Sequence, residues 1–289
     1  MIIIWTIFQM NIPMNEPSPF IDSKKDINSD INWNLNRDII KPDWPAPERV
    51  HAFCTTRHHG FSKGAYAGLN LALHVEDNPQ SVHSNRQQLI QQLNIPSEPL
   101  WLDQVHGNRV VNADYINTGQ LSGDQNKNQL AQADASFSEV ANTVCTVMTA
   151  DCLPVLICNR KGNKVAAAHV GWRGLAGDVI EATVASLSER HSELLVWFGP
   201  AIGAQAFEVG EDVYNIFVNN QPKAREAFKQ NRQGHYLADI YHLAKLRLHN
   251  IGIREIYGAE YCTYTDADQF YSYRRDGKTG RQASMIWFE

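Results

Sequence analysis

Three residues of metal-ligating type stand in three separate and distinctive stretches of the 289-residue chain. His106 lies in Trp-Leu-Asp-Gln-Val-His-Gly, Cys152 in Met-Thr-Ala-Asp-Cys-Leu-Pro-Val, and His169 in Ala-Ala-His-Val-Gly-Trp-Arg-Gly. Two imidazoles and a thiolate suit zinc, and three protein ligands leave a fourth position for water or substrate, as in catalytic zinc sites. The spacing also permits another interpretation, in which the histidines are hydrogen-bonded and the cysteine is a small buried side chain.

Several arginines are candidates for binding an anion. Arg57 follows Cys-Thr-Thr, Arg173 lies in a glycine-rich stretch, and Arg274 and Arg275 stand side by side in Ser-Tyr-Arg-Arg-Asp-Gly. A guanidinium can donate two parallel hydrogen bonds to one phosphate. The glycine-rich stretch 171–177 predicts a turn into a helix, whose free N–H groups would favour an anion. The alternatives are solvated surface charges for the arginines and a packing role for the turn.

Asp151 directly precedes Cys152 in the sequence. A carboxylate there can act as a general acid or base, or can orient a metal-bound histidine. An equally good interpretation makes it a turn residue before a strand. We therefore take His106, Asp151 and Cys152 as candidate catalytic residues, with Arg57, Arg173 and Arg274 as candidates for binding substrate or phosphate.

Composition and charge exclude several classes of protein. The formal net charge of -5 provides no global attraction for nucleic acid or an anionic membrane, so an anionic substrate must be held by local arginines. Five cysteines without a C-x-x-C pair argue against a disulfide framework and for a reducing compartment. The apolar run 1–10 is too short to span a bilayer and lacks the basic start of a signal peptide. We expect a cytoplasmic protein, monomeric or weakly dimeric.

The pattern along the chain predicts a flexible arm over residues 1–40 and one domain over 41–289, because the arm is polar and lacks an apolar period. Expected strands cover 50–56, 144–149, 153–158, 165–170 and 194–199, with further strands near 254–261 and 283–288. Expected helices run from a cap at Ser81 to Asn94, over 175–190, over 209–218, and from a cap at Asp239 to Asn250. Residues 116–131 read as a solvated loop. Strands arrive in groups, which favours an α+β fold with mixed sheets.

Eight ordered motifs closely resemble the YfiH-like family, the laccase-domain family once labelled polyphenol oxidases and later recognised as purine nucleoside phosphorylases. They are Cys54-Thr-Thr-Arg57, Gly68-Leu-Asn-Leu71, Trp101-Leu-Asp-Gln-Val-His-Gly107, Met148-Thr-Ala-Asp-Cys-Leu-Pro-Val155, Ala167-Ala-His-Val-Gly-Trp-Arg-Gly-Leu-Ala176, Gly199-Pro-Ala-Ile-Gly203, Phe207-Glu-Val-Gly210 and Ser272-Tyr-Arg-Arg-Asp-Gly-Lys-Thr-Gly-Arg281. The resemblance covers the chain from about residue 40 to its end.

The resemblance implies a single-domain α/β sandwich flanked by helices, with zinc held by His106, Cys152 and His169. It also implies phosphorolysis of adenosine, inosine, guanosine and methylthioadenosine, and deamination of adenosine. The alternative is copper-dependent oxidation of polyphenols, since copper can replace zinc at such ligands. However, none of the 11 histidines forms the H-x-H pair typical of a multicopper cluster. A metal-stabilised binding module without catalysis is a third possibility.

Overall fold

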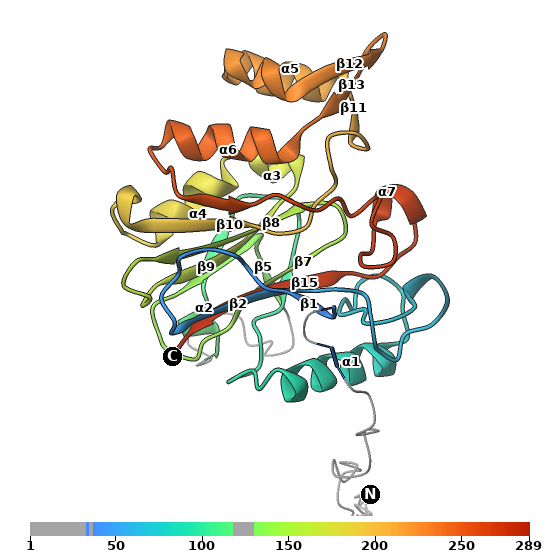
Figure 1. Ribbon diagram of the computed structural model, residues 1–289, viewed down its shortest axis with the longest axis vertical. Helices are drawn as coiled ribbons and strands as arrows, with labels where there is room; N and C mark the ends of the chain where they lie inside the picture. Colours follow the sequence, from blue (N-terminus) through green and yellow to red (C-terminus); the bar gives the residue numbers. More distant parts are fainter. Residues whose placement is uncertain (1–32, 35–36, 118–129) are drawn as a thin grey trace, which may run out of the picture. The chain divides into compact units, whose positions relative to one another are not determined.

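The computed structural model describes residues 33–34, 37–117 and 130–289 (Figure 1). Residues 1–32 of the expected arm and 118–129 of the expected loop lie outside this description. The compact unit begins at Trp33, whose side chain is buried. The Asp38 carboxylate is also buried and accepts a hydrogen bond from the Asn34 N–H. The folded unit therefore begins before residue 41, and residues 37–40 at the end of the expected arm belong to it.

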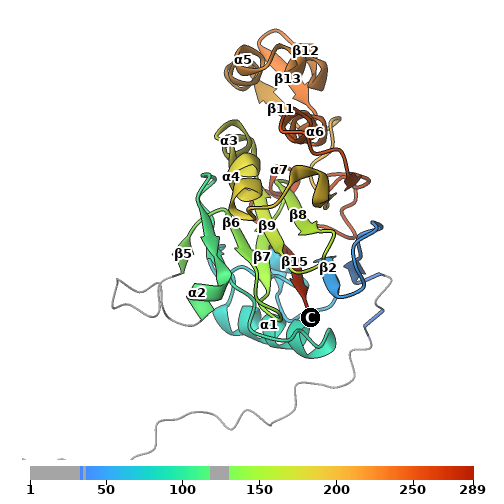
Figure 2. The same cartoon turned by 90° about the vertical axis from the view of Figure 1, so that its left-hand side faces the viewer.

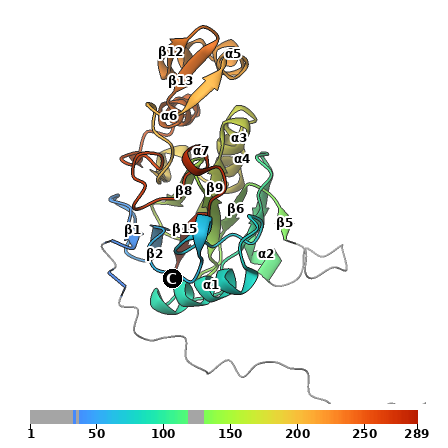
Figure 3. The same cartoon turned by 90° about the vertical axis from the view of Figure 1, so that its right-hand side faces the viewer.

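Two β-sheets face each other in the centre of this unit (Figures 2 and 3). The first has the order β1-β2-β15-β7 and is antiparallel, with β1 at Ile39–Ile40, β2 at Val50–Thr55, β15 at Gln282–Phe288 and β7 at Cys145–Thr149. The second has the order β14-β10-β8-β9-β6-β4, with β14 at Ile256–Gly258, β10 at Leu194–Phe198, β8 at Leu153–Asn159, β9 at Val165–Val170, β6 at Ala135–Ser138 and β4 at Val110–Asn112. Its β10–β14 and β4–β6 pairs are parallel and the others antiparallel, so the expected mixed-sheet α+β sandwich is confirmed.

Two small sheets complete the strands. The strands β3 at Leu102–Asp103 and β5 at Ala131–Gln132 form a parallel pair beside the main sheets. The strands β11 at Glu208–Gly210, β13 at His235–Ala238 and β12 at Phe228–Arg232 form an antiparallel sheet. This sheet carries α5 and lies beyond α6 in Figure 1.

The helices are mostly short. They are α1 at Pro79–Gln92, α2 at Ala113–Asn117, α3 at Trp172–Ala176, α4 at Val179–Ser186, α5 at Glu211–Asn220, α6 at Ile240–Asn250 and α7 at Tyr273–Asp276, with 3-10 turns at Gly64–Tyr66, His191–Glu193 and Pro222–Ala227. Within the described ranges, no helix has the length and apolar character needed to cross a membrane.

Helix α6 confirms its prediction most closely. The Asp239 side chain accepts a hydrogen bond from the His242 N–H, and Gly252 beyond the end adopts a φ of 89°. The first is the N-cap that the sequence indicated, and the second is the left-handed glycine that commonly follows the end of a helix. The three central strands are also where they were expected. However, β7 belongs to one sheet while β8 and β9 belong to the other.

Three helix predictions were wrong at their boundaries. Helix α1 is capped by Asn78 rather than Ser81, because the Asn78 side chain accepts hydrogen bonds from two N–H groups of the first turn. The helix expected over 175–190 is two helices, since Asp178 adopts a left-handed φ of 68° between α3 and α4. The helix expected from residue 209 begins at Glu211, because the residues before it pair as β11.

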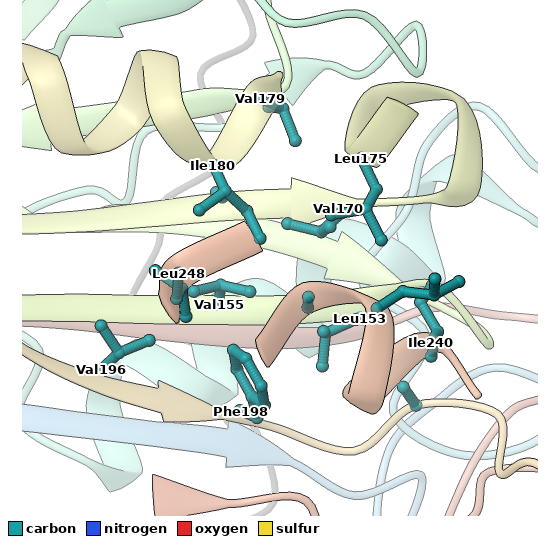
Figure 4. Close-up of a cluster of buried hydrophobic side chains, with 14 of the residues drawn as sticks. Leu153, Val155, Val170, Leu175, Val179, Ile180, Val196, Phe198, Ile240 and Leu248 are labelled. Atoms are coloured by element: carbon teal, nitrogen blue, oxygen red, sulfur yellow. The ribbon is translucent and has the colours of Figure 1, made fainter. Parts of the chain in front are cut away.

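The core has two layers, one on each face of the six-stranded sheet. Successive residues of a strand point to opposite faces, so Leu153 and Val155 of β8 pack under the helices while Leu156 packs against the other sheet. Figure 4 shows the helical layer, where Ile180 of α4 and Leu248 of α6 lie over the strands. Because β8 and β9 are buried on both faces, the groups at their ends are held rigidly.

Candidate metal centre and substrate cavity

The three candidate ligands come together at one end of the central strands. His106 lies in the loop after β3, Cys152 immediately precedes β8, and His169 is the fifth residue of β9. Their ligand atoms all lie within 4.8 Å of one another. The Cys152 Sγ is 3.8 Å from His106 Nε2, and the two imidazole rings meet edge to face with centroids 4.7 Å apart. The sequence therefore selected residues that the fold brings into one cluster.

A buried carboxylate that the sequence did not indicate holds both histidines. The Asp134 side chain has no exposed surface, and its Oδ1 lies 2.8 Å from the Nδ1 of His169. The same carboxylate accepts hydrogen bonds from three successive N–H groups, of Val105, His106 and Gly107, at 3.2, 2.8 and 2.6 Å. With its Nδ1 engaged in this way, His169 presents Nε2 to the cluster.

The three N–H bonds to Asp134 also account for the backbone of His106. His106 has a φ of 62°, in the left-handed region that a residue with a Cβ enters at a cost. A second side chain, Gln104, ties the same loop to β7, because its amide donates to the Met148 carbonyl and accepts from the Met148 N–H, both at 2.8 Å. The loop conformation that aims His106 is thus fixed from two sides.

Gly171 allows the ligands to approach. A Cβ at this position would lie 2.9 Å from His106 Cδ2 and 3.1 Å from Cys152 Sγ. Such separations are shorter than ordinary van der Waals contact, so a larger residue would push the ligands apart. The helix that follows has only five residues, which is too short to support the anion site that was expected at its start. The glycine serves the ligand cluster instead.

The donor set fits a tetrahedral ion. With metal–sulfur and metal–nitrogen bonds near 2.3 and 2.05 Å, a tetrahedral zinc would hold its sulfur and nitrogen ligands about 3.6 Å apart. The observed 3.8 Å between Cys152 Sγ and His106 Nε2 is close to that value. One ring nitrogen of each histidine and the cysteine sulfur would be the ligands, with Asp134 as the outer partner of His169.

Electrostatics in the cluster favour the thiolate. Burial raises the pKa of Cys152, but the positive charge of His169 and hydrogen bonds from both histidines outweigh it and lower the pKa to about 6. Burial lowers the pKa of His169, whereas the Cys152 thiolate and the hydrogen bond to Asp134 raise it to about 9. A cysteine binds a metal as its thiolate, so Cys152 is prepared for that role in neutral solution.

The cluster forms one wall of a cavity of about 560 Å³. Apolar and aromatic side chains form much of the remaining lining, namely Met148, Trp172, Ile202, Phe207, Ile240 and Tyr273. Three arginines, Arg173, Arg274 and Arg281, also line it, while Asp151 is the one acidic residue among the described lining residues. A cavity of this size with a few convergent polar groups is typical of a small-molecule site.

The structure separates the arginines that the sequence grouped together. Arg173 is exposed and stacks over Trp172, and Arg274 donates to the Glu208 carbonyl, both at the cavity. Arg57 does not line the cavity. Its guanidinium donates to the Ala67 and Ala267 carbonyls and lies 4.7 Å from the Tyr271 ring centroid, so it links loops. The expected role of Arg57 in holding phosphate beside the metal ligands does not fit this position.

The second arginine of the adjacent pair is also structural. Arg275 donates to the carbonyls of Thr263, Tyr264 and Phe270, and it pairs with Asp276. These bonds fix the turn that carries α7 at the end of β8 and β9 (Figure 3).

Asp151 lies in the cavity wall but does not orient a histidine. Its Oδ1 accepts a hydrogen bond from the Thr263 hydroxyl at 2.7 Å, and its Oδ2 accepts one from the Arg274 N–H at 2.6 Å. Its φ of 98° is again in the left-handed region. Asp151 therefore anchors α7 to the turn before β8. Asp134, rather than Asp151, is the carboxylate that orients a histidine of the cluster.

A larger cavity of about 740 Å³ lies elsewhere, between α6 and the segment 258–266. Its lining includes Lys245, His249 and the half-buried Cys262, but none of the three clustered ligands. Size alone does not indicate chemistry, and the smaller cavity holds the metal-ligating group and the arginines.

Fold and site together define a mixed-sheet protein with a His-Cys-His metal-ligand group in a small-molecule cavity, and similarity to known proteins is consistent with this class. Residues 51–289 match the family described as multi-copper polyphenol oxidoreductase laccase. The chain belongs to this family.

Its relatives are named for a different activity. It is 49% identical over 251 residues to a purine nucleoside phosphorylase of Pseudomonas aeruginosa, covering 86% of this chain and 98% of the relative. It is 49% identical over 249 residues to the purine nucleoside phosphorylase YfiH of Escherichia coli, again covering 86% of this chain and 98% of the relative.

Solved structures share the fold. A Neisseria meningitidis protein superposes with a TM-score of 0.80 at 46% identity, covering 87% of this chain and 99% of that chain. YlmD of Geobacillus stearothermophilus also gives a TM-score of 0.80, at 29% identity, covering 88% of this chain and 97% of that chain.

Proposed function

We propose that this protein is a zinc-dependent purine nucleoside phosphorylase that accepts adenosine, inosine, guanosine and methylthioadenosine and also deaminates adenosine. The observation that carries the proposal is the His106, Cys152 and His169 group in the wall of a cavity that is both aromatic and cationic. The names of the relatives support the phosphorylase activity. The number of cysteines supports a cytoplasmic location.

Phosphorolysis replaces the N-glycosidic bond with a bond between the ribose C1′ and a phosphate oxygen, and the purine leaves with a proton. The reaction needs the nucleoside and the phosphate to be held together in one orientation. Trp172, Phe207 and Tyr273 offer aromatic surface for the purine, and the cavity arginines offer charge for the phosphate. That one cavity of about 560 Å³ offers both kinds of surface supports the proposal.

Deamination needs a water that is nucleophilic at neutral pH. When bound, zinc supplies this chemistry by lowering the pKa of a coordinated water to about 7. The chain's part is to hold the three ligands, with Asp134 and Gln104 fixing their supports, and to leave one side of the cluster open to the cavity.

Copper oxidation of polyphenols is the second candidate, because the family description names it. A multicopper oxidase requires several copper sites. The described residues contain one group of three or more His, Cys, Asp or Glu residues placed to hold a metal. We therefore rank oxidase activity after nucleoside phosphorolysis.

The test is a chromatographic assay of adenosine with and without phosphate, combined with elemental analysis. We expect adenine and ribose 1-phosphate only when phosphate is present, and inosine in its absence. Zinc should be near one per chain and strongly reduced in Cys152→Ala. Cys262→Ala is the matched control, because this thiol lies outside the ligand cluster, and it should keep its zinc. Release of adenine without phosphate, or no conversion of adenosine, would contradict the proposal.

A further inference from the structure

Among the described residues that line the site cavity, Arg281 differs from the other arginines in how its guanidinium is held. Its Nη1 donates to the Thr279 and Gly280 carbonyls at 2.9 and 3.0 Å. These two bonds use both hydrogens of that nitrogen. The head group is thereby fixed in one orientation by its own backbone.

The remaining edge of this guanidinium has no partner in the described part of the chain. No hydrogen bond or ion pair engages Nε or Nη2 of Arg281, and neither atom is among the buried polar atoms that lack a partner. Both atoms therefore remain accessible. Together Nε and Nη2 form the side edge of the guanidinium, which donates two parallel hydrogen bonds to an oxyanion.

Arg281 forms no ion pair with an acidic side chain in the described part of the chain. Asp151, the acidic residue of the lining, already accepts a hydrogen bond at each oxygen from other groups. Burial lowers the pKa of Arg281, while the negative charges of Cys152 and Asp151 raise it, and Arg281 lines the same cavity as the ligand cluster. A partly buried cation that has no ion-pair partner favours an anionic ligand.

The other cavity arginines are less suited to this task. Arg173 is exposed and stacks on Trp172, so water would compete with an anion for its guanidinium. Arg274 uses Nη1 to reach the Glu208 carbonyl and its backbone N–H to reach Asp151, which ties the small sheet to α7. His74 lines the same cavity, and the charge of Arg281 contributes to lowering its pKa, after burial.

We propose that Arg281, in a cavity that His74 also lines, forms the subsite that binds inorganic phosphate or the phosphate group of a sugar phosphate. This inference rests on the proposed phosphorolysis and names the residues that hold its second substrate. Arg281 and the three ligands line the same cavity, so a phosphate held there by Arg281 would share the cavity with the ligand cluster. The role assigned to Arg57 from the sequence thus passes to Arg281.

Binding of inorganic phosphate to the full-length, metal-loaded protein tests the inference without any nucleoside chemistry. Isothermal titration calorimetry is expected to show phosphate binding weakened by about 100-fold in Arg281→Met, as loss of two charge-assisted hydrogen bonds implies. Arg281→Lys keeps the charge but cannot donate two parallel hydrogen bonds, and it should weaken phosphate binding about 10-fold. The control is Arg225→Met, which removes an exposed arginine that does not line the cavity and should bind as the unchanged protein does.

Kinetics separate this inference from the proposed function. In the phosphorolysis assay, Arg281→Met should raise the KM for phosphate by about 100-fold and leave the KM for the nucleoside within about threefold. Equal phosphate affinity in Arg281→Met and Arg225→Met would overturn the subsite, even if phosphorolysis occurs. Absence of phosphate binding to the unchanged protein would overturn it too. Phosphate binding that depends on Arg281 without any conversion of nucleosides would keep the subsite and refute the function.

Discussion

Replacing Asp134 by Asn changes one atom of the group that supports both histidine ligands. The carboxylate accepts four hydrogen bonds, with His169 and the His106 N–H on Oδ1 and the Val105 and Gly107 N–H groups on Oδ2. An amide has one oxygen and one NH2 group, so in either orientation its NH2 faces N–H donors on one side. If the NH2 group takes the position of Oδ1, His169 and the His106 N–H lose their acceptor. If it takes the position of Oδ2, the Val105 and Gly107 N–H groups lose theirs.

The size of the effect follows from these contacts. Hydrogen bonds to a charged group contribute about 1.5–3 kcal/mol each. Loss of two of them is expected to lower the free energy of unfolding by about 3 kcal/mol, or the melting temperature by roughly 6–12 °C for a domain of this size. Loss of an outer partner of a metal-bound histidine typically weakens metal binding by 10- to 100-fold, and we expect that range for Asp134→Asn.

The assay is competition between the protein and a chromophoric chelator for zinc, accompanied by thermal unfolding of the metal-free protein. Asp151→Asn is the matched control. Its amide can accept from the Arg274 N–H and donate to the Thr263 hydroxyl, so zinc affinity should stay within about threefold. A lower melting temperature with unchanged zinc affinity in Asp134→Asn would show that Asp134 is only structural. Equal loss of affinity in both variants would also refute the reasoning.

Three further predictions concern the metal ligands and the boundary of the fold. With pKa values of about 6 for Cys152 and about 9 for His169, metal binding to the metal-free protein should release one proton between those pH values, from His169. Zinc affinity should therefore fall about tenfold per unit as pH drops from 9 to 6, and more steeply below, as calorimetry in two buffers can measure. Gly171→Ala should reduce the zinc content measured by elemental analysis without changing the far-UV circular dichroism spectrum. Gly107→Ala is the control and should keep its zinc, because the added Cβ would lie at an ordinary van der Waals distance from Asp134. A chain beginning at Trp33 should keep its melting temperature, whereas one that also lacks β1 should melt several degrees lower; equal melting would place the arm boundary at residue 40.

The sequence was sufficient where the information is local. Apolar runs predicted the central strands because a strand buried on both faces must be apolar at every position. The cap at Asp239 was predictable because its side chain bonds an N–H only three residues away. The types of the metal-ligating residues and the family motifs pointed to His106, Cys152 and His169 before their distances were known.

Only the tertiary structure could decide which distant groups meet. Apolar runs do not say which sheet a strand joins, so β7 could not be assigned to the sheet opposite β8 and β9. The sequence did not identify Asp134, because a single carboxylate before a short strand resembles an ordinary turn residue. Its role depends on contact with His169, which is 35 residues away in the sequence. Nothing in the sequence distinguishes Arg57 from Arg281. In the folded chain, Arg57 contacts main-chain carbonyls and the Tyr271 ring, whereas Arg281 lines the cavity and, among the described residues, has no hydrogen-bond partner for its Nε and Nη2. The neighbours of a charged side chain are set by contacts between residues far apart along the chain.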